Sequence, residues 1–382
     1  MKSPQHLLIV VGARPQFIKA AALNRALATS SNWRSSWIHT GQHHDHALSS
    51  RFFEELDLPT PEVTLTPNAE SRELRLGDMM HGIRARIQED RPDWVLVFGD
   101  TDSTLAGAWA AAAERVPLVH VEAGLRSHQW SMPEEVNRVL TDRLSSVLVC
   151  PTDVAVDHLK AEGIVHACPV DALPNPTMPV VLRTGDVMHD NALHFGTSWP
   201  EESRGRGQVL LTMHRPSNVD DSKRLRTWLE SISHWLQSEG RRAVFPVHPR
   251  TQKSLDASWT NWREHAAGMG IDCVDPMGYL ELLRAVCDAP LVLTDSGGVQ
   301  KEAFSLGTRC VVLRPTTEWV EQVTLGHSTL VADPAELPDA AHTALHQGRF
   351  HPSDLYGSGH SAMDILRCLE ERMEPSRTRS PR

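Results

Sequence analysis

The chain has 382 residues, of which 40% are hydrophobic and 23% charged, so it is long enough for two globular domains of ordinary size. Its formal net charge is −10 and its basic residues are scattered, which argues against a nucleic-acid-binding surface. The six cysteines form no CxxC pair, no apolar run approaches about 18 residues, and the first residues lack a signal-peptide pattern. We therefore expect a cytoplasmic, reduced protein with no membrane contact.

The first half alternates short apolar runs with helical patterns. In chain order we predict a strand at 7–11, a second strand that ends at residue 39, and further strands at 94–98, 118–121 and 147–150. We predict helices at 15–27, 76–89, 103–115 and 133–144. This order is typical of a doubly wound parallel sheet, in which ligand sites lie at the carboxyl ends of the strands.

The second half repeats this alternation. We predict strands at 209–212, 243–247, 271–274, 291–293 and 310–313, with helices at 225–236, 278–286, 299–306 and 361–372. The fold class is therefore α/β, with two Rossmann-like doubly wound domains facing a cleft. Because 168–179 contains four prolines and suits a linker, we expect domains at 1–170 and 171–358, a terminal helix at 359–373 and a disordered tail at 374–382.

Cationic residues follow the first strand, where Gly12-Ala13-Arg14-Pro15 replaces the GxGxxG dinucleotide fingerprint. Pro15 suits the first helical position, so Arg14 is expected at the strand end and Lys19 one turn further on. Both suit support of a phosphate or a leaving group, which we favour at this location, and a surface arginine with a solvated lysine is the alternative.

Carboxylates follow the next strand ends. Asp100 comes too early to cap the helix that follows, whereas either Thr101 or Asp102 suits that role, and two carboxylates in one loop are weak evidence for a metal. We favour a metal-free site. Glu122 follows the strand at 118–121, and Glu134 opens a helix, where an acidic residue often serves only the helix dipole.

Anion-binding patterns follow the strands of the second half. His214 and His248 each come directly after an apolar run, and Ser296-Gly297-Gly298 follows another. Glycines at a helix N-terminus expose backbone N–H groups to a diphosphate, and Glu302 lies where it could accept hydrogen bonds from a ribose. A tight turn with a capped helix is the alternative.

The order of these motifs resembles the non-hydrolysing UDP-N-acetylglucosamine 2-epimerase family. The matching segments are 12–19, 40–43, 99–101, 120–126, 133–138, 214–215, 246–248 and 295–300. The resemblance implies a fold like that of the B-type glycosyltransferases, a UDP-sugar substrate and a homodimer.

Three departures from the usual family pattern bear on the substrate. Pro216-Ser217 replaces Arg-Glu after His214-Arg215, Lys301 replaces a glutamate, and Trp319 replaces an arginine. The segment Glu318-Trp319-Val320-Glu321 resembles the branch that acts on UDP-2,3-diacetamido-2,3-dideoxyglucuronate. Lys301 would complement an acidic sugar, although a lysine on an exposed helix face is an equal explanation.

The resemblance implies a reaction without a cofactor. Neither tyrosine is followed four places later by lysine, which argues against transient oxidation by NAD. In the family's route a base removes the C2 proton as UDP leaves C1, and re-addition to the 2-acetamidoglucal gives the epimer.

The residues that the resemblance places in this site fall into three groups. The catalytic group is Asp100, Glu122, Glu134 and His214, and the substrate-binding group is Arg14, Lys19, Arg138, His248, Ser296, Gly297, Gly298 and Glu302. Within these groups Arg138 is expected to orient Glu134. Gln42 and His43 match a region where family members bind a second, activating UDP-sugar.

The sequence therefore predicts an isomerase that interconverts UDP-GlcNAc and UDP-ManNAc for polysaccharide precursors. A 2-epimerase of UDP-2,3-diacetamido-2,3-dideoxyglucuronate is the alternative. A B-type glycosyltransferase or an inactive UDP-sugar-binding regulator is more distant, because neither requires the three carboxylates.

Overall fold

The computed structural model describes residues 3–42, 52–68, 70–169 and 172–373, which belong to two units. The first unit is Met1–Asn191 with Asp354–Arg382, and the second is Ala192–Ser353. The division falls inside α7 (Val187–Gly196) rather than at 170/171, because β7 (Val180–Arg183) pairs with β6 (Val147–Cys150) and so extends the first sheet.

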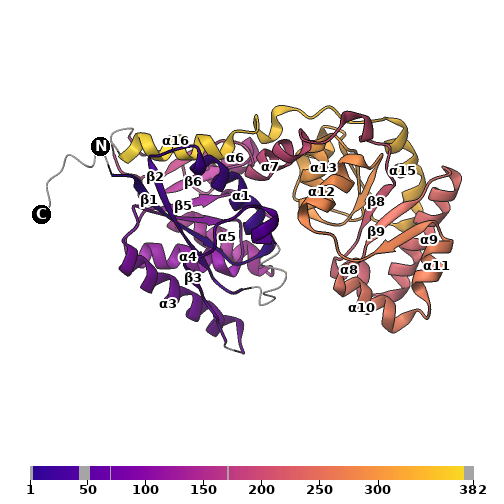
Figure 1. Ribbon diagram of the computed structural model, residues 1–382, viewed down its shortest axis with the longest axis horizontal. Coiled ribbons are helices and arrows are strands. Elements are labelled where there is room, and N and C mark those ends of the chain that lie inside the picture. The colour runs from indigo at the N-terminus through magenta and orange to yellow at the C-terminus, as the bar shows by residue number, and fades with distance from the viewer. Residues whose placement is uncertain (1–2, 43–51, 69, 170–171, 374–382) are drawn as a thin grey trace, which may run out of the picture. The chain divides into compact units, whose positions relative to one another are not determined.

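The first unit contains a parallel sheet of order β3-β2-β1-β4-β5-β6-β7 (Figure 1). The other strands are β1 (Gln5–Val11), β2 (Trp33–His39), β3 (Val63–Thr64), β4 (Trp94–Phe98) and β5 (Leu118–Val121). The helices are α1 (Arg14–Ala28), α3 (Arg72–Asp90), α4 (Asp102–Ala113), α5 (Pro133–Leu144), α6 (Asp153–Ala161), the short η3 (Asp354–Tyr356) and α16 (Ser361–Met373). The strands β1, β4, β5 and β6 are buried throughout, as expected of a parallel sheet covered on both faces.

The second unit contains a parallel sheet of order β10-β9-β8-β11-β12-β13. Its strands are β8 (Val209–Thr212), β9 (Ala243–Pro246), β10 (Ile271–Val274), β11 (Val292–Thr294), β12 (Cys310–Val312) and β13 (Ser328–Leu330). Its helices are η1 (Glu201–Ser203), α8 (Pro216–Val219), α9 (Ser222–Ser238), α10 (Pro249–Ser258), α11 (Trp262–Gly268), α12 (Tyr279–Asp288), α13 (Gly297–Leu306), α14 (Val320–Thr324), η2 (Pro334–Glu336) and α15 (Leu337–His346). The expected α/β class with two parallel sheets is confirmed.

Small residues bring α4 close to the first sheet. The helix is rich in alanine, and a Cβ added at Gly107 would lie 2.7 Å from Val97 Cγ1 of β4. A larger side chain there would push the helix away from the strand. The close packing fixes the N-terminus of α4, and with it the loop that carries Asp100.

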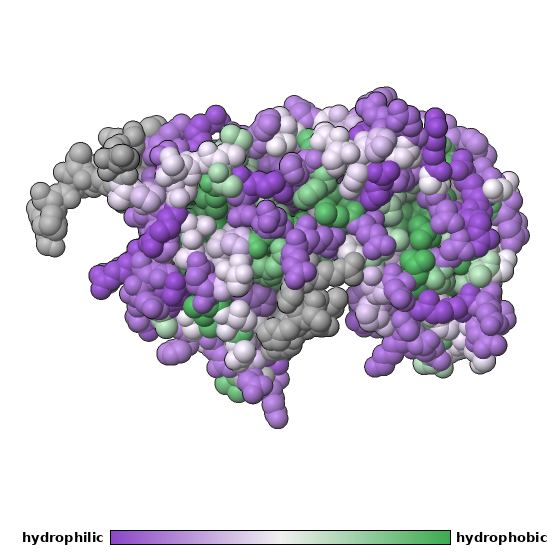
Figure 2. Space-filling model, viewed as in Figure 1, coloured by the Kyte–Doolittle hydropathy of each residue, from purple (hydrophilic) through white to green (hydrophobic). Residues whose placement is uncertain are grey.

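The helix α16 belongs to the first unit, where Trp33 Nε1 donates to Glu370 Oε1 at 2.6 Å. The expected tail 374–382 lies outside the described residues. Hydrophilic side chains predominate on the face shown in Figure 2, in keeping with a charged fraction of 23%. Among the described residues, no helix has both the length and the apolar character needed to cross a membrane.

Candidate functional site

The loops that follow β1 and β4 are joined by Gln16, a residue that we did not predict for the site from the sequence. Its buried side chain accepts hydrogen bonds from the backbone N–H groups of Gly12 at 2.8 Å and Ala13 at 3.1 Å. It also donates to the Phe98 carbonyl at 3.1 Å and to Thr104 Oγ1 at 3.0 Å. The loop after β1 and the loop after β4 are therefore held together by one amide.

Arg14 is the first residue of α1, with Pro15 second, one position later than expected. The Arg14 guanidinium lies over the Phe52 ring, 5.0 Å from its centroid. Its role toward a phosphate stays a prediction.

Lys19 and Glu122 form a buried ion pair between α1 and the end of β5. Their side chains are 8% and 10% exposed, so the predicted phosphate ligand Lys19 is directed at a carboxylate. Glu122 has φ of +75°, an uncommon conformation for a residue with a side chain and one that concentrates at functional sites. A Cβ at Gly99 would lie 3.0 Å from Lys19 Nζ and 3.2 Å from Glu122 Oε2, so a larger residue there would crowd this pair.

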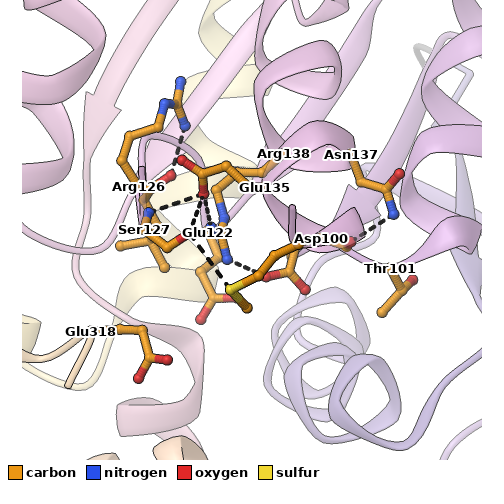
Figure 3. Close-up of polar contacts among 12 residues, drawn as sticks. Asp100, Thr101, Glu122, Arg126, Ser127, Glu135, Asn137, Arg138 and Glu318 are labelled. Atoms are coloured by element: carbon orange, nitrogen blue, oxygen red, sulfur yellow. Dashed lines mark hydrogen bonds and ion pairs between the residues drawn. The ribbon is translucent and has the colours of Figure 1, made fainter. Parts of the chain in front are cut away.

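Asp100 is paired with Arg138, whose guanidinium also donates to Glu135 Oε2 at 2.6 Å (Figure 3). Burial alone lowers the pKa of Arg138, but the charges of Asp100 and Glu135 outweigh it and raise the pKa. The expected partner, Glu134, is exposed in the first turn of α5, whereas its neighbour Glu135 lies on the buried face. The structure therefore places Arg138 between Asp100 and Glu135 instead.

Glu135 is a residue that sequence reasoning missed. It accepts hydrogen bonds at 2.9 Å from the N–H groups of Ser127 and His128 and from Ser127 Oγ. Burial raises its pKa, but these bonds and Arg138 outweigh burial and hold the pKa below its ordinary value. Glu135 thus stays ionised and fixes the loop that follows Glu122.

The structure shows which of Thr101 and Asp102 caps the helix α4. Thr101 is the N-cap and accepts a hydrogen bond from the Thr104 N–H, while Asp102 is the first helical residue. Arg72 Nε donates to Asp102 Oδ2 at 2.9 Å, and Asn137 Nδ2 donates to Asp102 Oδ1 at 3.0 Å. Asn137 Nδ2 also lies 3.0 Å from the carbonyl of Asp100, so it ties α5 to this loop.

A second missed group lies beneath the loops. The fully buried Asp142 meets His120 Nδ1 at 2.7 Å through one oxygen, and through the other it meets the Gly124 N–H at 3.2 Å and Arg126 at 2.7 Å. His120 Nε2 in turn meets the Gly99 carbonyl at 2.7 Å. Burial raises the pKa of Asp142, but His120 and Arg126 outweigh burial and lower it. One carboxylate therefore connects the loops that carry Asp100 and Glu122.

In the second unit the buried Asp295 joins the loops after β8 and β11. Its carboxylate accepts from the N–H groups of His214 at 3.0 Å and Arg215 at 2.9 Å and from Asn218 Nδ2 at 3.1 Å. The His214 and His248 rings lie 5.2 Å apart between centroids, so the structure brings these two predicted residues together. His248 also caps α10 by accepting from the Arg250 N–H at 3.1 Å.

Ser296 is the N-cap of α13, and Gly297 and Gly298 are its first two residues. No side chain caps this helix, which leaves its N-terminus suited to an anion. Glu302 lies one turn later and is 4% exposed.

Comparison with known proteins decides the family. The family model described as UDP-N-acetylglucosamine 2-epimerase matches residues 25–370 of the chain. A UDP-2,3-diacetamido-2,3-dideoxy-D-glucuronate 2-epimerase from Pseudomonas aeruginosa is 40% identical over 367 residues, covering 95% of this chain and 99% of that protein. The chain belongs to the UDP-N-acetylglucosamine 2-epimerase family.

Two further likenesses come from Methanocaldococcus jannaschii. A UDP-N-acetylglucosamine 2-epimerase from that organism is 37% identical over 367 residues, covering 95% of this chain and 98% of that protein. A crystal structure of its UDP-GlcNAc 2-epimerase in complex with UDP-GlcNAc and UDP matches with a TM-score of 0.81 at 35% identity, covering 96% of this chain and 99% of that one. The predicted family and fold are confirmed.

Two departures from the usual pattern of the 2-epimerase family meet in the second unit. Lys301 Nζ lies 4.5 Å from the centroid of the Trp319 ring, and Trp319 Nε1 donates to the Gly297 carbonyl at 3.0 Å. Lys301 is 3% exposed, so the explanation of an exposed lysine is wrong. Trp319 thus links Lys301 to the start of the glycine-containing helix.

Gln42, expected in the 2-epimerase family at a site for an activating UDP-sugar, contacts the start of α4. Its Oε1 accepts from the Ser103 N–H at 2.9 Å and from Ser103 Oγ at 2.6 Å. His43, the other expected residue, lies outside the described residues.

Proposed function

We propose that this chain inverts C2 of a UDP-2-acetamido sugar, interconverting UDP-GlcNAc and UDP-ManNAc. The observation that carries the proposal is the pairing of two strand-end carboxylates with separate cations, Asp100 with Arg138 and Glu122 with Lys19. They follow β4 and β5, which are neighbours in the sheet. Carboxylates held in this way suit proton transfer at one reacting carbon.

The proposed reaction is elimination followed by re-addition. A carboxylate of the first unit takes the C2 proton, the C1–O bond breaks, and UDP leaves with the bonding electron pair as 2-acetamidoglucal forms. UDP oxygen then adds to C1 while an acid delivers a proton to the other face of C2. Asp100, Glu122 and Glu134 are the candidates for base and acid.

The diphosphate needs stabilisation, because negative charge grows on it as the C1–O bond breaks. We assign its binding to Arg14, His214, His248 and the N-terminal N–H groups of Ser296-Gly297-Gly298, with Glu302 accepting from the ribose. The N-terminus of α13 suits this role because it carries partial positive charge and no side-chain cap.

A second substrate is favoured by one observation. Buried Lys301 against Trp319 places a cation beside the glycine-containing loop, where the usual family pattern has a glutamate and an arginine. The Pseudomonas aeruginosa relative is named for UDP-2,3-diacetamido-2,3-dideoxy-D-glucuronate, whose carboxylate a cation would complement. We therefore propose that uronate as the alternative substrate.

Further parts of the proposal follow from the family. We expect a homodimer, and a second UDP-sugar bound near Gln42 as an activator. We also place the protein in the cytoplasm, because the six cysteines are free, as is typical of a reducing compartment.

The decisive experiment follows C2 by NMR. UDP-GlcNAc and the diacetamido-uronate are incubated separately with the protein in D2O. Deuterium at C2 together with the C2-inverted product supports the proposal, and reaction of the uronate alone identifies the substrate. Two inert C2 positions contradict the epimerase proposal, and a new glycosidic bond with added acceptors favours a glycosyltransferase.

A further inference from the structure

Three side chains with metal-binding atoms converge in the second unit, at the end of α9 and on α15. His342 Nδ1 lies 2.6 Å from Glu239 Oε1, and His346 Nε2 lies 3.2 Å from Glu239 Oε2. The two ring centroids are 4.4 Å apart, and one donor atom from each of the three residues lies within 4.8 Å of the others. Each carboxylate oxygen thus faces a different imidazole.

The two helices that carry this cluster share one hydrophobic core. From α9 it contains Leu225, Trp228, Leu229, Ile232, Trp235 and Leu236, and from α15 it contains Leu337, Ala341 and Ala344. Ser231 Oγ of α9 also donates to the Pro334 carbonyl, just before α15, at 2.5 Å. The cluster therefore lies on two helices, α9 and α15, whose relative position is fixed by packing, as a preorganised metal site requires.

The spacing of the histidines places them on one side of α15. Residues four apart on a helix are neighbours on its surface. Glu239 is the C-cap of α9, with its N–H bonded to the Trp235 carbonyl, so its position is fixed by the helix end. The histidine side chains are 62% and 59% exposed and the glutamate 12%, which leaves the rings room to rotate and solvent room to complete a coordination shell.

Two imidazoles and one carboxylate are a donor set that favours zinc and related first-row ions over magnesium or calcium. Tetrahedral zinc with bonds of about 2.0–2.1 Å separates two ligand atoms by about 3.3 Å. The 2.6 Å and 3.2 Å contacts of His342 and His346 are to different oxygens of Glu239, and one donor atom from each residue lies within 4.8 Å of the others. A carboxylate that binds through both oxygens, or a rotation of the exposed rings toward one oxygen, would bring the three side chains to one ion.

We propose that Glu239, His342 and His346 bind one divalent ion of the zinc class, with water in the open position. The site would cross-link the end of α9 to α15. It uses none of the residues assigned to the nucleotide sugar, so it stands independently of the proposed function. The same geometry also allows plain histidine–carboxylate hydrogen bonds, and the experiment separates the two.

Zinc binding is measured on the full chain after metal removal, by competition with a chromophoric chelator. We expect the unmodified protein to bind one more zinc equivalent than the double variant His342→Ala/His346→Ala. Glu239→Gln should weaken this binding at least about tenfold, since it removes a ligand and not a supporting contact. The matched control is His234→Ala, which removes an exposed histidine of α9 that lies outside the cluster.

Thermal unfolding supplies a second readout. Zinc that binds the folded chain raises the Tm of the unmodified protein and of His234→Ala, and this increase should be lost in the double variant. Because both substituted histidines are largely exposed, the double variant should keep its fold, which circular dichroism checks. Equal zinc stoichiometry and affinity in the unmodified and double-variant proteins would overturn the proposal.

Discussion

Each unit has a fully buried carboxylate that joins two strand-end loops, and these two carboxylates have different partners. Asp142 of the first unit meets the cation Arg126 and the ring of His120, whereas Asp295 of the second accepts from the backbone N–H groups of His214 and Arg215. The carboxylate of Asp142 is thus paired with a guanidinium. The carboxylate of Asp295 is held mainly by amide N–H groups, with Nδ1 of the His214 ring 3.6 Å away.

The difference matches the chemistry that we propose for each unit. Loops that transfer protons must hold ionisable side chains in fixed positions, and ion pairs such as Lys19–Glu122 serve that need. Loops that bind a diphosphate present N–H groups, and Asp295 fixes the backbone of one such loop. If the two units differ in this way, substitutions of the carboxylates in the first unit should affect turnover of the substrate, and substitutions in the loops of the second unit should affect binding of UDP.

The largest expected effect is that of Asp100→Asn on turnover. The substitution keeps the size of the side chain but removes its ability to take or give a proton, so kcat should fall by about 10³-fold. Deuterium exchange at C2 measures turnover, and calorimetric titration with UDP measures binding. UDP affinity should stay largely unchanged, because Asp100 is not among the residues assigned to the diphosphate, most of which lie in the second unit.

Asp78→Asn is the control for that experiment, since Asp78 is an exposed acid on α3 of the same unit. It should leave both turnover and UDP binding unchanged. Loss of UDP binding in Asp100→Asn would contradict the division between the units.

The next largest effect concerns folding stability. Asp142→Ala leaves the buried Arg126 and His120 without their shared carboxylate, which should lower the free energy of unfolding by about 3–5 kcal/mol. Asp295→Ala leaves neutral N–H groups unsatisfied, for which we expect about 1–3 kcal/mol. Urea unfolding followed by circular dichroism compares the two, with the exposed Asp157→Ala as control. A larger loss for Asp295→Ala would reverse the contrast drawn above.

The parts of this arrangement that could be predicted from the sequence lie where a buried strand ends. An apolar run followed by a glycine and a polar residue placed Asp100 at the end of β4, and the same reasoning placed Glu122 after β5. The glycine-containing start of α13 was predicted for the same reason. Period and turn residues are local signals, so the succession of these strands and helices along the chain and the residues where they end follow from them.

The supporting contacts could not be predicted, because they join residues that are distant in the sequence. Nothing local indicates that Lys19 meets Glu122 or that Asp142 lies beneath both loops. The choice between Glu134 and Glu135 depends on the rotation of α5 against the sheet, which two adjacent glutamates do not specify. Arg138 was therefore assigned to the wrong neighbour.

The two units also differ in the partners of their buried histidines, for which we expect a smaller effect on folding stability. His120 of the first unit meets a carboxylate, whereas His327 of the second meets the neutral groups Ser328 Oγ and the Thr308 carbonyl, each at 2.9 Å. Burial lowers the pKa of His327 from 6.5 to about 4. Between these values the unfolded chain binds a proton that the folded chain does not, so stability is lost as the pH falls from 6.5 toward 4.

This histidine should contribute about 3 kcal/mol to the loss of unfolding free energy over that pH range. Urea unfolding at a series of pH values measures the loss, and His327→Gln should reduce its slope. His234→Gln, which replaces an exposed histidine, should leave the slope unchanged. An identical slope in the unmodified and His327→Gln proteins would show that the ring titrates normally.

The smallest effect tests whether Lys301 selects the sugar. Lys301→Met keeps the buried stem against Trp319 but removes the charge, whose contact with the ring contributes about 0.5–2 kcal/mol. If the charge complements a uronate, the KM for the diacetamido-uronate should rise about tenfold while the KM for UDP-GlcNAc hardly changes. Steady-state kinetics on both sugars measure this split, with the exposed Lys160→Met as control. An equal change on both sugars would mean that Lys301 only supports the loop through Trp319, and that a buried cation in the binding unit carries no information about the substrate.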